Sequence, residues 1–140
     1  MTTNANSILA LDIGTVRIGV AIADAVARLP RPLTTLANDE SFIEQVLSII
    51  TSESVTVLVV GLPRSLDGDD TDQTRLVRSF VASWESEISL PISYQDEALS
   101  SARAKDELQS RGRPYQKAAV DALAATFILE DYLLSKREAI

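Results

Sequence analysis

The chain has 140 residues, of which 46% are hydrophobic, and a formal net charge of −7. This length predicts one domain, and this apolar content predicts a packed core rather than a disordered chain. The sequence contains no cysteine and no histidine, which excludes disulfides, thiolate catalysis, histidine-based triads and histidine metal ligands. Any metal must therefore be held by oxygen atoms, which favours Mg²⁺, Mn²⁺ or Ca²⁺.

The amino-terminal segment, residues 1–7, is short and polar. It has neither the basic start nor the apolar core of a signal peptide, and no later run is long enough to span a membrane. We expect residues 1–7 to form a disordered tail ahead of a single domain at residues 8–140. We also expect a soluble, cytoplasmic protein that has no membrane partner.

Three strands are expected near the start of the chain. Residues 8–11 and 18–22 are short, β-rich runs on either side of a glycine-containing turn, which predicts a hairpin. Residues 32–36 can add a third strand. The first part of the sheet is therefore expected to begin with an antiparallel pair.

A helix and a buried strand are expected next. Ser41 and Glu44 match a capping box, and apolar residues then recur at helical spacing over residues 42–50. Residues 55–60 form a continuous apolar run, which is typical of a strand buried on both faces in a parallel sheet.

The second half of the chain alternates between turn, helix and strand patterns. Residues 61–72 are rich in turn residues, an amphipathic helix is expected over 76–84, and a strand over 90–95. Two further helices are expected over 100–110 and 116–134. This order predicts an α/β fold with a mixed five-stranded sheet and helices on both of its faces.

Four carboxylates stand where such a fold places its ligand sites. Asp12 ends the first strand, Asp96 and Glu97 end the last strand, and Asp121 lies on the apolar face of the last helix. Ligand sites of α/β sheets gather at strand ends, and a carboxylate that faces the core is costly unless it meets a cation or hydrogen-bond donors. A divalent cation would relieve the repulsion among such acids, and carboxylate ligands suit Mg²⁺.

Each of these carboxylates also has a purely structural interpretation. Asp12 can be a turn former before Gly14, because aspartate readily bonds its own backbone. Asp96 or Glu97 can cap the helix that follows, and Asp121 can be a favourable charge near a helix N-terminus. The placement of all of them together is what favours a metal site.

Charge is distributed unevenly along the chain. Residues 37–97 hold twelve acidic and three basic side chains, whereas residues 98–117 hold five basic and two acidic ones. An acidic protein repels nucleic-acid phosphates, so the basic segment is the candidate contact surface, with a solvated helix face as the alternative. Thr15 and Arg17, in the turn after Asp12, are further candidates for phosphate contact, and a plain surface charge is the alternative for Arg17.

The motifs together resemble those of the YqgF/RuvX family. They are LDIGTVRIGVAIAD, then VVGLPRSLDG with Gln73 after it, then DE after a strand, then VDALAATFILEDYL. The resemblance covers residues 8–134, in order and at compatible spacing. It implies an RNase H-like fold and a small bacterial protein of a family described as Holliday junction resolvases and as nucleases that mature the 5′ end of small-subunit ribosomal RNA.

The resemblance implies a metal-dependent nuclease that hydrolyses phosphodiester bonds, with Asp12, Glu97 and Asp121 as catalytic residues and as ligands of Mg²⁺ or Mn²⁺. The implied partners are precursor ribosomal RNA or branched DNA, together with ribosomal subunit precursors, for a monomer or homodimer acting in ribosome biogenesis. The expected nucleic-acid contacts are Thr15, Arg17, Arg64, Arg103, Lys105, Arg111, Arg113 and Lys117. Two departures weaken the expected nucleic-acid affinity: Ala98 stands where the family usually has arginine, and RGRPYQK is thin in charge.

Two other classes of protein remain open. One is a non-catalytic nucleic-acid or protein-binding module that keeps the fold. The other is a relative of the actin-like phosphotransferases, which carry a similar Asp-x-Gly-Thr turn. Those enzymes hold a nucleotide between two domains, and one domain of 140 residues leaves no such cleft.

Overall fold

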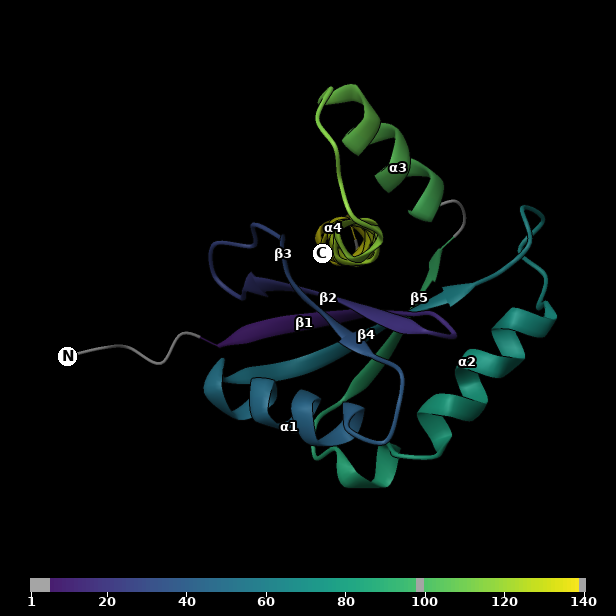
Figure 1. Cartoon of the computed structure of the whole chain (residues 1–140). Coiled ribbons are helices and arrows are strands. Elements are labelled where there is room, and N and C mark those ends of the chain that lie inside the picture. The colour runs from purple at the N-terminus through teal and green to yellow at the C-terminus, as the bar shows by residue number, and fades with distance from the viewer. Residues whose placement is uncertain (1–5, 98–99, 139–140) are drawn as a thin grey trace.

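The computed structural model describes residues 6–97 and 100–138, with five strands and four α-helices in the described part (Figure 1). The elements, in chain order, are β1 (Ser7–Ile13), β2 (Arg17–Asp24), β3 (Arg31–Ala37), α1 (Phe42–Ser52), β4 (Val55–Pro63), α2 (Asp72–Ala82), a 3₁₀ turn (Glu85–Glu87), β5 (Ile92–Glu97), α3 (Ser100–Ser110) and α4 (Lys117–Glu138). No helix in these residues is long and apolar enough to cross a membrane.

The strands form one mixed sheet in the order β3-β2-β1-β4-β5. β1 pairs antiparallel with β2, and β2 with β3, whereas β1 with β4 and β4 with β5 are parallel. The parallel strands β1, β4 and β5 therefore end at the same edge of the sheet. This arrangement confirms the mixed five-stranded sheet that the strand patterns predict.

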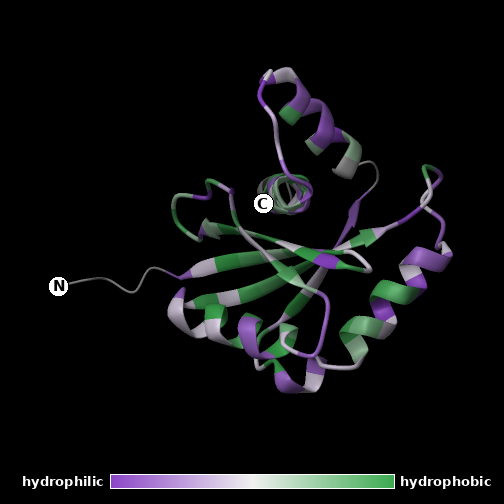
Figure 2. Ribbon diagram, in the orientation of Figure 1, coloured by the Kyte–Doolittle hydropathy of each residue, from purple (hydrophilic) through white to green (hydrophobic). Residues whose placement is uncertain are grey.

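Helices cover both faces of the sheet in separate layers. α1 and α2 lie on one face, α4 crosses the other, and α3 packs on the far side of α4 (Figure 1). The strands β1, β2 and β4 are mainly hydrophobic, whereas hydrophilic residues are frequent in α2, α3 and at the end of β5 (Figure 2). The core beneath α1 and α2 includes an aromatic cluster of Phe42, Phe80 and Trp84, whose ring centroids lie 5.4–5.8 Å apart.

α4 is buried on two sides because it lies between the sheet and α3. Ala125, Ile128 and Leu129 pack on the sheet, whereas Leu123 and Ala124 pack with α3 residues. Because protein lies on two sides of α4, an aspartate on either side near its start faces other protein groups. The helix thus positions Asp121 as the apolar spacing of the sequence predicts.

Local details at some element ends differ from the prediction. The capping box is wrong: the Ser41 side chain caps no amide, and its backbone N–H and hydroxyl donate to Asp39 Oδ1 at 2.9 and 2.6 Å. Asp39 stabilises the approach to α1 as an Asx-type turn instead. Trp84 lies beyond the end of α2, and β1 starts at Ser7. The expected tail falls largely on residues 1–5, which lie outside the described residues.

Candidate active site

Asp12 lies near the end of the central strand β1 and faces α4. Ala10, two residues earlier on the same side of the strand, packs in the core beneath α4. Asp12 pairs with Gly19 on β2. Leu11 pairs with Val60, which puts Asp12 beside the position of Gly61 on β4. The most buried strand of the sheet thus carries a partly buried carboxylate under the helix.

Glu97 comes to the same place from the end of β5. It pairs with Pro63, two residues beyond Gly61 in β4. A Cβ atom on Gly61 would lie 3.3 Å from Glu97 Cγ and 2.4 Å from Ile128 Cδ1. The missing side chain at Gly61 therefore makes room for both the Glu97 side chain and α4 above it.

Asp121 reaches the site from above, on the second turn of α4. A Cβ atom on Gly19 would lie 1.9 Å from the Asp121 carbonyl oxygen, so the helix backbone rests directly on β2. Thr35 Oγ1 also donates to the Ala118 carbonyl oxygen at 2.7 Å, which ties the start of α4 to β3. Sequence reasoning missed these two anchors, although a glycine inside a strand is a known sign of close backbone approach.

The three carboxylates are near enough to act on one another electrostatically. Burial of Asp12, together with the charges of Glu97 and then Asp121, raises the pKa of Asp12 from 3.8 to about 7. Desolvation and like charge both disfavour the ionised form. The site is therefore a partly buried concentration of negative charge that a cation would stabilise.

Arg17 already neutralises one member of this group. Its Nε donates to Asp121 Oδ2 at 2.6 Å, from the first residue of β2. Within residues 6–97 and 100–138, no three acidic side chains are arranged so that they could hold a metal ion as they stand. The carboxylate oxygens of the three acids are the donors that a hard divalent cation prefers. The carboxylate of Asp121 is bonded to Arg17 instead.

Basic side chains surround Asp121 on the outer side of the site. A cleft of about 310 Å³ is lined by Arg17, Lys105, Lys117, Val120 and Asp121. Lys105 comes from α3 and Lys117 begins α4, and both are exposed. The structure thus brings three of the expected phosphate contacts to the entrance of the carboxylate group.

The other expected phosphate contacts lie elsewhere. Arg64 is paired with Asp96 at 3.1 Å and Asp70 at 3.6 Å. Arg103 faces α4, where it pairs with Asp131 at 3.3 Å and lies over the ring of Phe127.

The remaining candidates lie in the turn between α3 and α4 and in the turn between β1 and β2. Arg111 pairs with Glu107, one turn earlier in α3, at 3.5 Å, and lines a hollow of about 200 Å³ with Arg113. Thr15 is exposed in the β1–β2 turn and lines a separate hollow against α2. The basic segment is therefore not one continuous surface. Ala98 lies outside the described residues.

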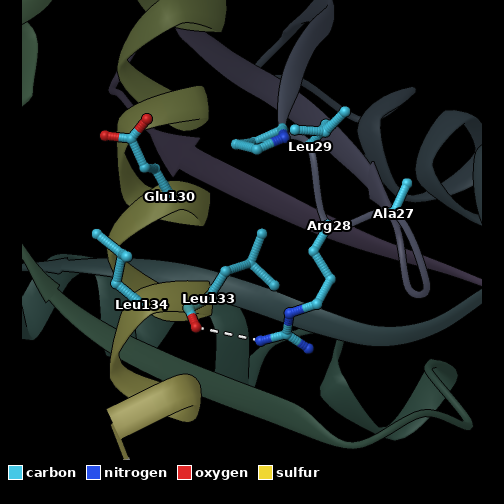
Figure 3. A pocket seen from close by; sticks show the side chains of 7 residues that line it. Ala27, Arg28, Leu29, Glu130, Leu133 and Leu134 are labelled. Atoms are coloured by element: carbon cyan, nitrogen blue, oxygen red, sulfur yellow. Dashed lines mark hydrogen bonds between the residues drawn. The ribbon is translucent and has the colours of Figure 1, made fainter.

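A larger hollow lies toward the other end of α4, away from Asp121. It has a volume of about 560 Å³ and is lined mainly by apolar side chains between the β2–β3 connection and α4 (Figure 3). Arg28 spans it and donates from Nη2 to the Leu133 carbonyl oxygen at 3.1 Å. It contains a single carboxylate, Glu130, and lacks the convergence of charged groups found around Asp12.

Comparison with solved structures identifies the fold that this arrangement of sheet and helices forms. T. thermophilus RuvC in complex with a Holliday junction substrate aligns with a TM-score of 0.57 at 16% identity, over 93% of this chain and 96% of that one. The fowlpox virus resolvase in complex with Holliday junction DNA aligns with a TM-score of 0.51 at 14% identity, over 95% and 97%. The fold is RNase H-like.

Sequence comparison narrows this class to one family. The sequence model of RuvX, described as Holliday junction resolvase, matches residues 6–135, and the chain belongs to this family. Two relatives named "Putative pre-16S rRNA nuclease" are 42% identical over 130 residues (Maridesulfovibrio salexigens; 90% of this chain, 96% of the relative) and 41% identical over 138 residues (Chloroflexus aurantiacus; 96% and 90%). The family resemblance of the motifs is thereby confirmed, and it makes the protein a nuclease, a hydrolase of phosphodiester bonds.

Proposed function

We propose that the protein is a divalent-metal-dependent endonuclease that trims the 5′ end of precursor 16S ribosomal RNA or resolves branched DNA. The observation that carries the proposal is the partly buried Asp12 carboxyl, whose pKa is raised to about 7 by burial first and then by the nearby charges of Glu97 and Asp121. A partly buried acid beside other acids is costly in a fold that has no structural need of it. Such a cluster is common at catalytic sites, where perturbed pKa values gather.

Asp12, Glu97 and Asp121 would hold Mg²⁺ or Mn²⁺ through their carboxylate oxygens. The cation would supply Lewis-acid stabilisation of the reacting phosphate and activation of a water. Asp12 must be ionised to act as a ligand, and a cation favours that form. The rigid position of Asp12 in the central strand and the two anchors of α4 hold Asp12 and the Asp121 backbone in fixed relation.

The cleft beside Asp121 would receive the nucleic-acid backbone. Lys105, Lys117 and Arg17 line it together with Asp121, so a phosphate held by these cations would lie next to the carboxylates. Arg111 and Arg113, which line a separate hollow, together with Thr15, Arg64 and Arg103, would contact the nucleic acid outside this cleft. We expect weak binding that is strongest at low salt, because the chain as a whole carries a charge of −7.

Cleavage assays on matched substrates test this function. We expect Mn²⁺- or Mg²⁺-dependent cleavage of an RNA that contains the 5′ precursor segment of 16S ribosomal RNA, or of a four-way DNA junction. Linear duplex DNA of equal length serves as the control substrate. Binding of both substrates without cleavage at any metal concentration would instead favour the non-catalytic module, and specific nucleotide binding would favour the phosphotransferase relative.

The two lysines of the cleft are expected to contribute to binding through phosphate charge alone. Lys105→Ala with Lys117→Ala should weaken RNA and junction binding alike and reduce the salt dependence, log Kd against log salt, by about one to two units. Fluorescence anisotropy over a salt series measures both. Arg75→Ala with Lys136→Ala removes equal charge at positions outside the cleft and serves as the control. If the two double variants had equal salt slopes, the nucleic acid would not bind in the cleft.

We further propose that the protein acts in the cytoplasm on ribosomal subunit precursors. Relatives of 41–42% identity carry the name of a 16S precursor nuclease, and that substrate is met during ribosome assembly. Branched DNA is the other candidate, since the two aligned resolvase structures hold Holliday junctions. Direct comparison of the two cleavage rates decides between them.

A further inference from the structure

The Arg17–Asp121 ion pair occupies an unexpected place in the proposed active site. The guanidinium binds the one carboxylate of the three that the helix contributes, at 2.6 Å. Arg17 also lines the cleft proposed to receive a phosphate. Arg17 therefore lies between the Asp121 carboxylate, which can bind a cation, and the cleft, which can bind an anionic phosphate.

The backbone on both sides of this pair is held firmly. The turn before Arg17 is closed by a hydrogen bond from Gly14 N–H to the Arg17 carbonyl oxygen at 2.9 Å. Asn38 ties the same turn twice, through its amide N–H to Val16 and its Nδ2 to Gly14. On the other side, Gly19 lies directly under the Asp121 backbone. Any rearrangement here must therefore occur in the two side chains.

The pair itself is easily exchanged. The Arg17 and Asp121 side chains are 37% and 21% exposed, so water can replace either partner. A partly exposed ion pair contributes only modestly to stability. A divalent cation near Asp12 would attract Asp121 more strongly than a single guanidinium does, because it carries twice the charge. The guanidinium, once released, would be left facing the cleft with Lys105 and Lys117.

We propose that Arg17 is an exchangeable partner of Asp121, which it neutralises in the free protein and leaves for a nucleic-acid phosphate when a divalent cation binds the carboxylate. This inference rests on the proposed function. The cation binds Asp121 and frees Arg17 for the phosphate, and the phosphate binds Arg17 and frees Asp121 for the cation. Metal and nucleic acid therefore bind with positive coupling, which must be reciprocal. Arg17 thereby contacts the substrate phosphate, and it favours completion of the metal site when substrate is present.

Metal affinity in the absence of nucleic acid is the first test. Arg17→Gln removes the competing guanidinium and should bind Mn²⁺ about tenfold more tightly than the wild-type protein, within the range usual for coupled sites. Arg17→Lys keeps the charge and should stay near the wild type. Arg75→Gln, which breaks an ion pair on α2, is the matched control and should change nothing. Electron paramagnetic resonance of free Mn²⁺ gives these affinities without any cleavage.

The coupling is the second test. A phosphorothioate RNA oligonucleotide, which resists hydrolysis, should tighten Mn²⁺ binding in the wild type by about tenfold more than in Arg17→Gln. A third measurement needs no variant: the Arg17 Nε–H resonance in nuclear magnetic resonance spectra of the wild type should shift when Mg²⁺ is added and again when the oligonucleotide follows.

The outcomes separate this inference from the proposed function. Equal or weaker Mn²⁺ binding by Arg17→Gln, or an Arg17 resonance that ignores Mg²⁺, overturns the exchange. If Asp12→Asn nevertheless abolishes Mn²⁺ binding, the metal site stands and only the exchange fails. If the wild type and Asp12→Asn bind Mn²⁺ equally, the metal site and the exchange fail together.

Discussion

Asp12→Asn is expected to abolish cleavage, with a loss of more than about 100-fold, while making the metal-free protein more stable. Loss of a group that only orients a metal ligand costs about 10–100-fold, and Asp12 is proposed as a ligand itself. Asparagine keeps the shape of the side chain and lacks the charge that holds a cation. Cleavage rates and Mn²⁺ affinity measure the loss. Asp67→Asn, in the exposed loop before α2, removes the same charge and serves as the control.

The stability gain follows from the raised pKa of Asp12, which moves from 3.8 to about 7. In the pH range between these values the folded protein holds a proton that the unfolded chain releases, so stability falls as pH rises from about 4 to 7. The full shift corresponds to on the order of 4 kcal/mol, an upper limit because Asp12 is only partly buried. We expect Asp12→Asn to lack this fall and to unfold several degrees higher than the wild type at pH 8 without metal.

Thermal melts at a series of pH values, for the wild type and Asp12→Asn, check this expectation. The difference in melting temperature between the two proteins reports on Asp12 alone, because all other carboxylates are present in both. Added Mn²⁺ should raise the melting temperature of the wild type at pH 8 and leave that of the variant unchanged, because a ligand stabilises only the form that binds it. A constant difference between the two proteins from pH 4 to 8 would mean that Asp12 is not buried among like charges.

The fold could be predicted from local patterns because each pattern has a direct physical cause. The apolar run at 55–60 lies in β4, where Val55 and residues 58–60 are buried while Thr56 is exposed, and the expected helix at residues 100–110 is α3. Ser41 shows the limit of such patterns. Its capping box with Glu44 is intact as sequence, yet Asp39, two residues before Ser41, accepts from the Ser41 N–H and hydroxyl instead. Two polar groups competing for the same N–H cannot be ranked without the backbone.

The carboxylate positions were predictable, whereas their partners were not. Strand ends and the apolar spacing of the last helix place Asp12, Glu97 and Asp121 in one region, and the raised pKa of Asp12 is consistent with that grouping. The Arg17–Asp121 pair joins residues 104 positions apart, which no local pattern encodes. Arg103, expected on a phosphate-facing surface, faces Asp131 and Phe127 because α3 packs on α4.

Gly19→Ala is expected to be the most destabilising small substitution near the site, at about 3 kcal/mol or more. Its Cβ would lie 1.9 Å from the Asp121 carbonyl oxygen and 2.9 Å from the Ala122 nitrogen, both of them backbone atoms of α4. Overpacking of a core usually costs about 1–3 kcal/mol, and here no side chain can rotate out of the way. The helix must move away from the sheet and carry Asp121 with it.

Gly61→Ala provides the matched comparison for this prediction. Its Cβ would meet the Ile128 side chain, with Cδ1 at 2.4 Å, and not the helix backbone. We expect a smaller loss, about 1–2 kcal/mol, that Ile128→Val partly restores because valine lacks that Cδ1 atom. Ile128→Val should give no such rescue in Gly19→Ala. Urea unfolding of the four variants measures the free energies, and Mn²⁺ binding reports on the position of Asp121. If Gly19→Ala were as stable as the wild type and bound Mn²⁺ equally well, α4 would not rest on β2 at Gly19, and the geometry that brings Asp121 to Asp12 would be wrong.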